Sequence, residues 1–307
     1  MDLTNKSRTD RREVRGFIVI AVLWILAALS ALVLIYLTYV TNTAVVVAGG
    51  TDRIQAEALV TAGIELTALQ LLGDAEDARP TSGTFNTKVG EARVFVAYRS
   101  EAARIDLNAA PKGLLAGLMK GLGVNPPDAA GYADRILAWR TSTELADQDP
   151  ENSFYRTSGA LYLPRHAPFP AIEELWLVRG IPPVVIEGML PYVTIFSNLA
   201  SINIADAAPQ VVAALPNMTP EKVQTVLAQR GDPTINPRSL LGIGGGEGVT
   251  LEASRAYRMT IDVELSGARR SGGAEVVILL LDSADEPYRV LSWRSFSDGS
   301  AALQKGP

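Results

Sequence analysis

The sequence contains no cysteine and a single histidine, and these two shortages exclude most common site chemistries. Without cysteine the chain cannot form disulfides, thiolate zinc sites, iron–sulfur clusters or a cysteine nucleophile. Because His166 stands alone, it would be the only base available to a Ser-His-Asp triad, and one chain cannot assemble a two-histidine zinc motif. No nucleophile signature accompanies His166, so a hydrogen-bonding role in its loop is favoured over general-base catalysis. The composition therefore disfavours most hydrolase and metalloenzyme classes, leaves a carboxylate-only hydrolase or a Ser-Lys dyad open without any motif for either, and makes a protein that is not an enzyme the favoured prediction.

Basic residues are also few. The 28 Lys and Arg residues are outnumbered by 33 Asp and Glu residues, which gives a net charge of −5. A nucleic-acid footprint is not visible in this balance, so we expect no nucleic-acid partner. Hydrophobic residues make up 48% of the 307 residues, which is enough chain and apolar surface for roughly two domains.

Charge is missing altogether from residues 17–40, a run of 24 residues. A helix needs about 20 apolar residues to span the hydrocarbon core of a bilayer. The residues that directly flank this run are basic only on its N-terminal side, since no charged residue occurs between Arg15 and Asp52, so the N-terminal side is predicted to be cytoplasmic and the rest exported. A cleaved secretory signal is disfavoured because the apolar region of such a signal has only about 7 to 15 residues, fewer than the run found here. An uncleaved signal anchor fits both the length and the charges.

The dipeptide Gly16-Phe17 lies where the basic leader meets the apolar run, which is where a type IV prepilin peptidase cuts. In this respect the sequence resembles a pilin-type protein. The resemblance implies that Gly16 precedes the cleaved bond and that Phe17 becomes the N-methylated first residue. The fifth mature residue of such proteins is usually glutamate, and here it is Ala21. A carboxylate in lipid needs a partner, so its absence suits a first or topmost subunit better than a repeating one.

Beyond the apolar run, hydrophobic periodicity predicts that the helix continues to about residue 74. Alternating patterns predict a hairpin of residues 84–90 and 91–100, turning at Gly90. Three further strands are predicted at residues 254–267, 274–283 and 287–295. The predicted fold class is α+β, with a long N-terminal transmembrane helix packed on an antiparallel sheet and a large all-α insertion.

The predicted insertion contains an internal repeat. Residues 103–118 align without a gap on residues 200–215, at an offset of 97. Each copy is predicted to be a short extended piece that enters a capped helix. Between the copies lie a polar acidic loop at 141–157 and two short helices around Arg179-Gly180-Ile181, similar to a helix-hairpin-helix. Its second helix starts at Pro182-Pro183, which offer no N–H to a phosphate, so a scaffold role is favoured.

Four motifs occur in the order RGFIVIAVLW, ARIDLNAAP, YLPRHAPFPAIEELWLVRGI and LPYVTIF. With them the chain resembles the type II secretion minor pseudopilin K family. The resemblance implies a pilin-like domain, an inner-membrane location, and assembly with the minor pseudopilins I and J at the pseudopilus tip to drive protein export. Other implied partners are the remaining pseudopilins, the prepilin peptidase and the inner-membrane assembly platform. The predicted divisions are a leader at 1–16, the helix at 17–74, the first strands at 75–102, the inserted helical domain at 103–240 and the last strands at 241–307.

Calcium is the one cofactor that the resemblance implies. Members often bind it through an aspartate-rich stretch after a tryptophan of the insertion, and here Trp139 is followed by RTSTELADQDPENSFY. The candidate oxygen ligands are Glu144, Asp147, Asp149 and Glu151. A solvated acidic loop is the alternative interpretation of this stretch. Two other functions stay open: a membrane-anchored DNA-uptake receptor that uses the helix-hairpin-helix, and an anchored periplasmic enzyme.

Overall fold

The first helix is the longest element of the chain. The computed structural model describes residues 10–143, 149–230, 232, 234–246, 248–265, 272–283 and 285–297. They form two units, of which the first ends at Glu57 and the second begins at Ala58. Helix α1 (Asp10–Gly73) runs through this boundary, and no proline interrupts it. It begins within the predicted leader and ends next to the predicted end at residue 74.

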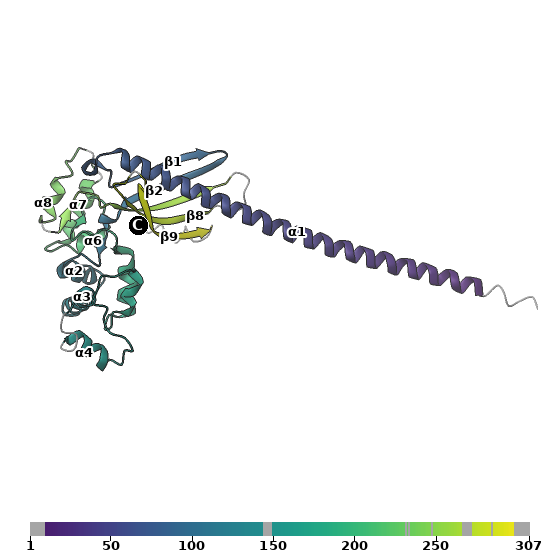
Figure 1. The fold of residues 1–307 in the computed structure, drawn as a ribbon, viewed down its shortest axis with the longest axis horizontal. Helices are drawn as coiled ribbons and strands as arrows, with labels where there is room; N and C mark the ends of the chain where they lie inside the picture. The colour runs from purple at the N-terminus through teal and green to yellow at the C-terminus, as the bar shows by residue number, and fades with distance from the viewer. Residues whose placement is uncertain are drawn as a thin grey trace, which may run out of the picture. The chain divides into compact units, whose positions relative to one another are not determined.

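The main sheet of the second unit has five antiparallel strands in the order β1-β2-β7-β8-β9 (Figure 1). The strands are β1 (Ser82–Val89), β2 (Ala92–Ser100), β7 (Ala256–Glu264), β8 (Gly272–Leu280) and β9 (Tyr288–Ser297). The hairpin predicted around Gly90 is confirmed, and this glycine has the positive φ of 61° that the turn requires. Strand β2 pairs with β7, so the C-terminal strands complete a sheet that begins before residue 100.

One face of this sheet packs on the part of α1 that belongs to the second unit. Strand β2 alternates strictly between buried and exposed residues, and its buried face includes Val96. A Cβ atom at Gly63 of α1 would lie 3.2 Å from Ile261 and 3.3 Å from Val96. The glycine therefore lets the helix approach the sheet closely. At the β9 edge the Tyr288 hydroxyl donates a hydrogen bond of 2.7 Å to Glu65 of α1.

The chain between β2 and β7 is mainly helical and has its own core of buried residues. Its α-helices are α2 (Lys112–Gly121), α3 (Pro126–Arg140), α4 (Pro150–Thr157), α5 (Pro183–Met189), α6 (Pro209–Ala213), α7 (Pro220–Arg230) and α8 (Ser239–Ile243). The same region contains the short 3-10 helices η2 (Glu101–Ala103), η3 (Ile172–Leu177) and η4 (Leu190–Tyr192). Another 3-10 helix, η1 (Glu76–Ala78), lies before β1. Two-residue strands pair in parallel: β3 (Ile105–Asp106) with β4 (Val193–Thr194), and β5 (Ile202–Asn203) with β6 (Val249–Thr250).

The predicted loop at 141–157 is wrong in its second half, which forms α4. The Asp149 side chain accepts hydrogen bonds from the N–H groups of Glu151 and Asn152, and Pro150 occupies the first helical turn. An aspartate cap followed by proline is a strong signal for the start of a helix. This signal is visible in the sequence, but the many charges around it favour a loop.

The segment that resembles a helix-hairpin-helix differs from the prediction in its first helix. The residues before Gly180 form the six-residue 3-10 helix η3, and the residues after it form α5. Gly180 has a φ of 84°, and a Cβ there would lie 2.8 Å from Nε of Arg135. The turn itself therefore requires glycine, because a side chain would be strained and would displace the arginine.

The repeat at offset 97 is a structural duplication. Strands β3 and β5 occupy equivalent positions and each has a parallel partner. In the first copy the Asp106 carboxylate accepts hydrogen bonds from the N–H groups of Asn108 and Ala109. In the second copy the Asn203 side-chain oxygen accepts one from the N–H of Ala205. The predicted side-chain caps are wrong, because α2 and α6 begin without a side-chain cap, and Asp106 and Asn203 instead stabilise the turns that precede these helices.

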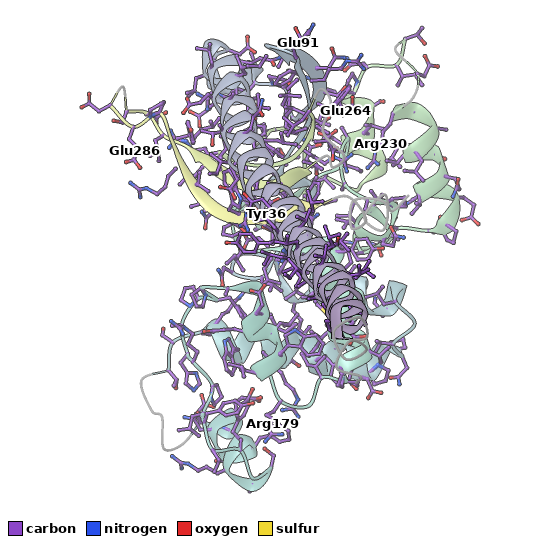
Figure 2. All side chains as sticks on the ribbon, turned by 90° about the vertical axis from the view of Figure 1, so that its right-hand side faces the viewer. Tyr36, Glu91, Arg179, Arg230, Glu264 and Glu286 are labelled. Atoms are coloured by element: carbon purple, nitrogen blue, oxygen red, sulfur yellow. The ribbon has the colours of Figure 1, made fainter. Side chains whose placement is uncertain are left out.

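In each copy of the repeat, an arginine from a later helix donates hydrogen bonds to two backbone carbonyls. Arg140 ends α3 and donates to the carbonyls of Leu107 at 2.5 Å and Ala110 at 2.7 Å. Arg230, labelled in Figure 2, ends α7 and donates to the carbonyls of Ile204 and Ala207, both at 2.8 Å. The two pairs of carbonyls are equivalent at the offset of 97. Both arginines lie outside the aligned segments, so the sequence repeat alone does not reveal them.

Gly117 of α2 lies at a close contact between the two copies, and Gly117→Ala is expected to destabilise the protein. A Cβ there would lie only 2.0 Å from the carbonyl oxygen of Ala214, its equivalent in the second copy. The backbone must move to make room, which costs about 1–3 kcal/mol of unfolding free energy. Gly113→Ala, in the same helix with nothing within 4 Å, is the matched control. We expect it to change stability by less than about 1 kcal/mol, in the stabilising direction. Equal denaturation midpoints for the two variants would contradict this packing.

Candidate functional site

The first unit presents a bare apolar helix surface. Val19–Tyr39 of α1 has a mean hydropathy of 2.7, and none of it is buried. Its large side chains are exposed, including Trp24 at 74% and Tyr36 at 65%, and Figure 2 shows Tyr36 on α1. A surface of 21 residues without a charge is stable only in lipid or against other apolar helices. The structure therefore agrees with a membrane anchor.

A second stretch of α1, Arg53–Gly73, is also long enough to span a membrane, with a mean hydropathy of 1.2. It differs from the first because 39% of it is buried. Ile64 and Leu71 are almost inaccessible, at 1% and 0% exposure. This stretch is the core helix that supports the sheet, whereas Val19–Tyr39 has no buried residue.

The predicted cleavage junction lies within α1. The backbone of both Gly16 and Phe17 is helical, and Ala21, one turn further along, is partly exposed. No Asp or Glu occurs between this position and Tyr39. The segment therefore offers no carboxylate to a neighbouring amino terminus. Cleavage at this junction stays a prediction.

Two of the four predicted calcium ligands have structural partners. Oδ1 of Asp149 caps α4, 2.8 Å from the N–H nitrogen of Glu151. Oε1 of Glu151 lies 3.0 Å from Nη1 of Arg135, whose guanidinium carbon is 3.7 Å from the centre of the Phe154 ring. Burial raises the pKa of the Glu151 carboxyl above its ordinary value, and Arg135 opposes that rise.

Glu144 and Asp147, the other two predicted ligands, lie outside the described residues. Within the described ranges no group of three or more acidic or histidine side chains could hold a metal ion. Asp149 and Glu151 therefore do not make a metal site by themselves, and Glu151 forms a salt bridge with Arg135. Calcium binding by this stretch stays a prediction.

His166 joins the chain on either side of the acidic stretch. Its Nδ1 lies 3.2 Å from the carbonyl oxygen of Thr141, and its Nε2 lies 2.9 Å from Oδ1 of Asn152. Asn152 is buried at 1% exposure. These contacts agree with the hydrogen-bonding role that the sequence favours for His166, and they hold the two ends of the stretch together.

A buried ionic cluster connects the helical region to the sheet. The Glu101 carboxylate is 1% exposed and lies 2.8 Å from Nε of Arg258 on β7, and it also accepts a hydrogen bond from the Thr194 hydroxyl. Arg258 reaches Glu275 of β8 at 2.6 Å. Burial opposes the charge of Arg258, but the two glutamates outweigh it and raise its pKa above the ordinary value. Sequence reasoning misses this cluster because its members are separated by up to 174 positions.

A family model agrees with the three motifs that lie between residues 103 and 196. The family model described as type II secretion system (T2SS), protein K, matches residues 96–198, so the resemblance to that family is confirmed over this part of the chain. One solved chain is from the crystal structure of the GspK-GspI-GspJ complex of the enterotoxigenic Escherichia coli type 2 secretion system. It is 18% identical, with a TM-score of 0.48, and the match covers 80% of this chain and 94% of that chain. No curated protein matches the chain.

Proposed function

We propose that this chain, which carries the protein K segment of the type II secretion system at residues 96–198, works as a minor pseudopilin. The observation that carries the proposal is that the chain has both that segment and an apolar helix surface at Val19–Tyr39 that no described part of the chain covers. A pseudopilin uses such a helix twice. It first anchors the subunit in the inner membrane, and it then packs against other subunits, which replace the lipid.

The proposed place of the chain is the tip of the pseudopilus. Ala21 supports this placement, because a subunit without an acid there has no charge with which to hold the amino terminus of a subunit above it. The minor pseudopilins I and J are the partners that the family resemblance implies. Together they would start and cap the filament that drives proteins across the outer membrane. The role is one of assembly and not of catalysis.

Processing and topology are further parts of the proposal. The prepilin peptidase would cut after Gly16 and methylate Phe17, and the assembly platform of the inner membrane would then extract the subunit. The basic leader supports a cytoplasmic amino terminus and a periplasmic C-terminal part.

A DNA-uptake receptor is not favoured by the contacts around α5. The N–H groups of Val185 and Ile186 already donate to the carbonyl of Pro182, at 2.9 Å and 3.2 Å. They are the first N–H groups after Pro182-Pro183 apart from that of Val184, so little remains for a DNA phosphate. The surrounding acidic residues, Glu173, Glu174 and Glu187, would also repel it.

Deletion of the gene in its host tests the proposal. We expect substrates of the secretion system to accumulate in the periplasm, and expression of the wild-type chain to restore their export. The restored strain also allows affinity purification of the chain from detergent-solubilised membranes, in which the I and J pseudopilins are expected. Unchanged secretion in the deletion strain would contradict the function, and a loss of DNA uptake with normal secretion would favour the receptor.

A further inference from the structure

A cavity of about 590 Å³ lies where the helical region meets one end of the sheet. It is in the size range of sites for small ligands, about 300–1,000 Å³. Its walls come from β1, β2, β7, β8, η2, η4 and α6. The lining residues that the argument uses are Arg99, Arg104, Arg258, Glu101, Glu275 and Val211.

Two of these arginines lie directly opposite each other on neighbouring strands of the sheet. Arg99 of β2 pairs in register with Arg258 of β7. Like charges at directly opposite positions of neighbouring strands are destabilising unless something neutralises them. Arg258 is neutralised, because both Glu101 and Glu275 contact its guanidinium. In the described part of the chain Arg99 makes no salt bridge and no side-chain hydrogen bond.

Arg104 is the third guanidinium of the cavity and is also unpaired within the described residues. It is only partly exposed. Burial lowers its pKa below the ordinary value, and the positive charge of Arg258 lowers it further. Glu101 and Glu275 raise this pKa, and Arg99 lowers it again, so that it stays below the ordinary value. The cavity therefore holds two guanidinium groups whose charge the described chain leaves without a direct partner.

The balance of charge indicates which anion would fit. Three arginines and two glutamates line the cavity, so one negative charge would neutralise it. A phosphate dianion would give the cavity a net negative charge and would be repelled by the two glutamates. A carboxylate carries a single negative charge, and its shape matches the planar fork of a guanidinium. Ala97, Pro191 and Val211 supply apolar wall against which a carbon skeleton can pack.

We propose that this cavity binds a carboxylate, which Arg99 and Arg104 hold from two sides. The carboxylate is either that of a free small acid or that of an acidic side chain in a peptide, and the chemistry of recognition is the same. Because the cavity lies between the sheet and the helical region, the ligand would also link these two parts of the second unit. The proposal does not depend on the role of the chain in secretion.

Titration calorimetry on the full chain in detergent tests the site with two pairs of probes. Benzoate represents a free acid and is compared with benzamide. A blocked Gly-Glu-Gly peptide represents a side chain and is compared with its Gln counterpart. We expect at least one acid to bind at least ten-fold more tightly than its amide. Binding of benzoate alone identifies a small acid as the source, and binding of the peptide alone identifies a protein. Equal binding of acid and amide in both pairs, or no binding, would overturn the proposal.

Variants locate the site. The double variant Arg99→Gln and Arg104→Gln is expected to weaken binding of the acid at least ten-fold. Its melting temperature is expected to be no lower than that of the wild type, because it removes charges that repel Arg258. Arg93→Gln, on the same strand but outside the cavity, is the matched control and should bind the acid as the wild type does. Unchanged binding by the double variant, or an equal loss in the control, would show that these arginines do not hold the ligand.

Discussion

Replacing Arg258 by methionine is expected to lower the unfolding free energy by about 3–5 kcal/mol. The change leaves Glu101, at 1% exposure, without the cation that lies 2.8 Å from it. The buried carboxylate has then lost both its hydration and its cation, and of these contacts only the hydrogen bond from Thr194 remains. Urea denaturation of the full chain in detergent, followed by circular dichroism, measures the loss.

Two further variants separate this effect from a general loss of packing. Arg93→Met removes a guanidinium from the same sheet whose partner, Glu264, is 3.7 Å away, with both side chains more than half exposed. An exposed pair of this kind contributes about 0–1 kcal/mol, so the control should unfold close to the wild type. Adding Glu101→Gln to Arg258→Met should restore part of the loss, because the buried charge is then gone. A denaturation midpoint for Arg258→Met equal to that of the control would contradict the account of the cluster.

Gly16→Ala is expected to abolish processing and, with it, secretion. The peptidase that we propose for this chain accepts a glycine before the cleaved bond, and a methyl group there would block the cut. The variant should remain in the membrane as the full precursor. Its exported part should stay folded, since residue 16 lies in the first unit and the sheet and helical core lie in the second. Intact mass and secretion of a substrate are the two measurements.

Gly49→Ala is the matched control for this variant. It also replaces a glycine of α1, but it lies far beyond the cleavage junction. It is expected to be cut and to support secretion. Normal secretion by Gly16→Ala would contradict the proposed processing, and a failure of both variants would point to a general sensitivity of the helix.

Elements defined by local pattern are those that the sequence predicts correctly. The alternation in β1 and β2 and the turn at Gly90 are contained in fewer than 20 consecutive residues, and the structure confirms them. The same holds for the repeat, because each copy has the short strand followed by a helix that its local sequence predicts. Such features need no knowledge of the rest of the chain.

Features that depend on contacts between distant residues cannot be predicted from local sequence patterns. The partners of Glu101 are Thr194 and Arg258, and nothing near any of the three indicates that they meet. The contact of Gly117 with Ala214 is similar: the repeat shows that the positions correspond, but not that they touch. Helix α4 is a different case, since its cap at Asp149 is a local signal outweighed in the prediction by the surrounding charge.

The same distinction applies to the candidate site. The apolar run predicts the anchor surface directly, because length and the absence of charge are sufficient for it. The predicted ligands Asp149 and Glu151 have the right chemistry for calcium, but their cap and ion-pair partners become visible only in the structure. Oxygen-bearing side chains serve capping and salt bridges as readily as they serve a metal ion.

The mature amino terminus of the wild-type chain tests the central claim most directly. The protein would be recovered from membranes of cells that also express the prepilin peptidase of the host, and then analysed by intact mass and amino-terminal sequencing. A chain that begins at N-methylated Phe17 is the predicted result, and it would place the protein among the processed pilin-like proteins. A chain that retains Met1 would contradict the claim and would leave only an uncleaved membrane anchor with an exported domain.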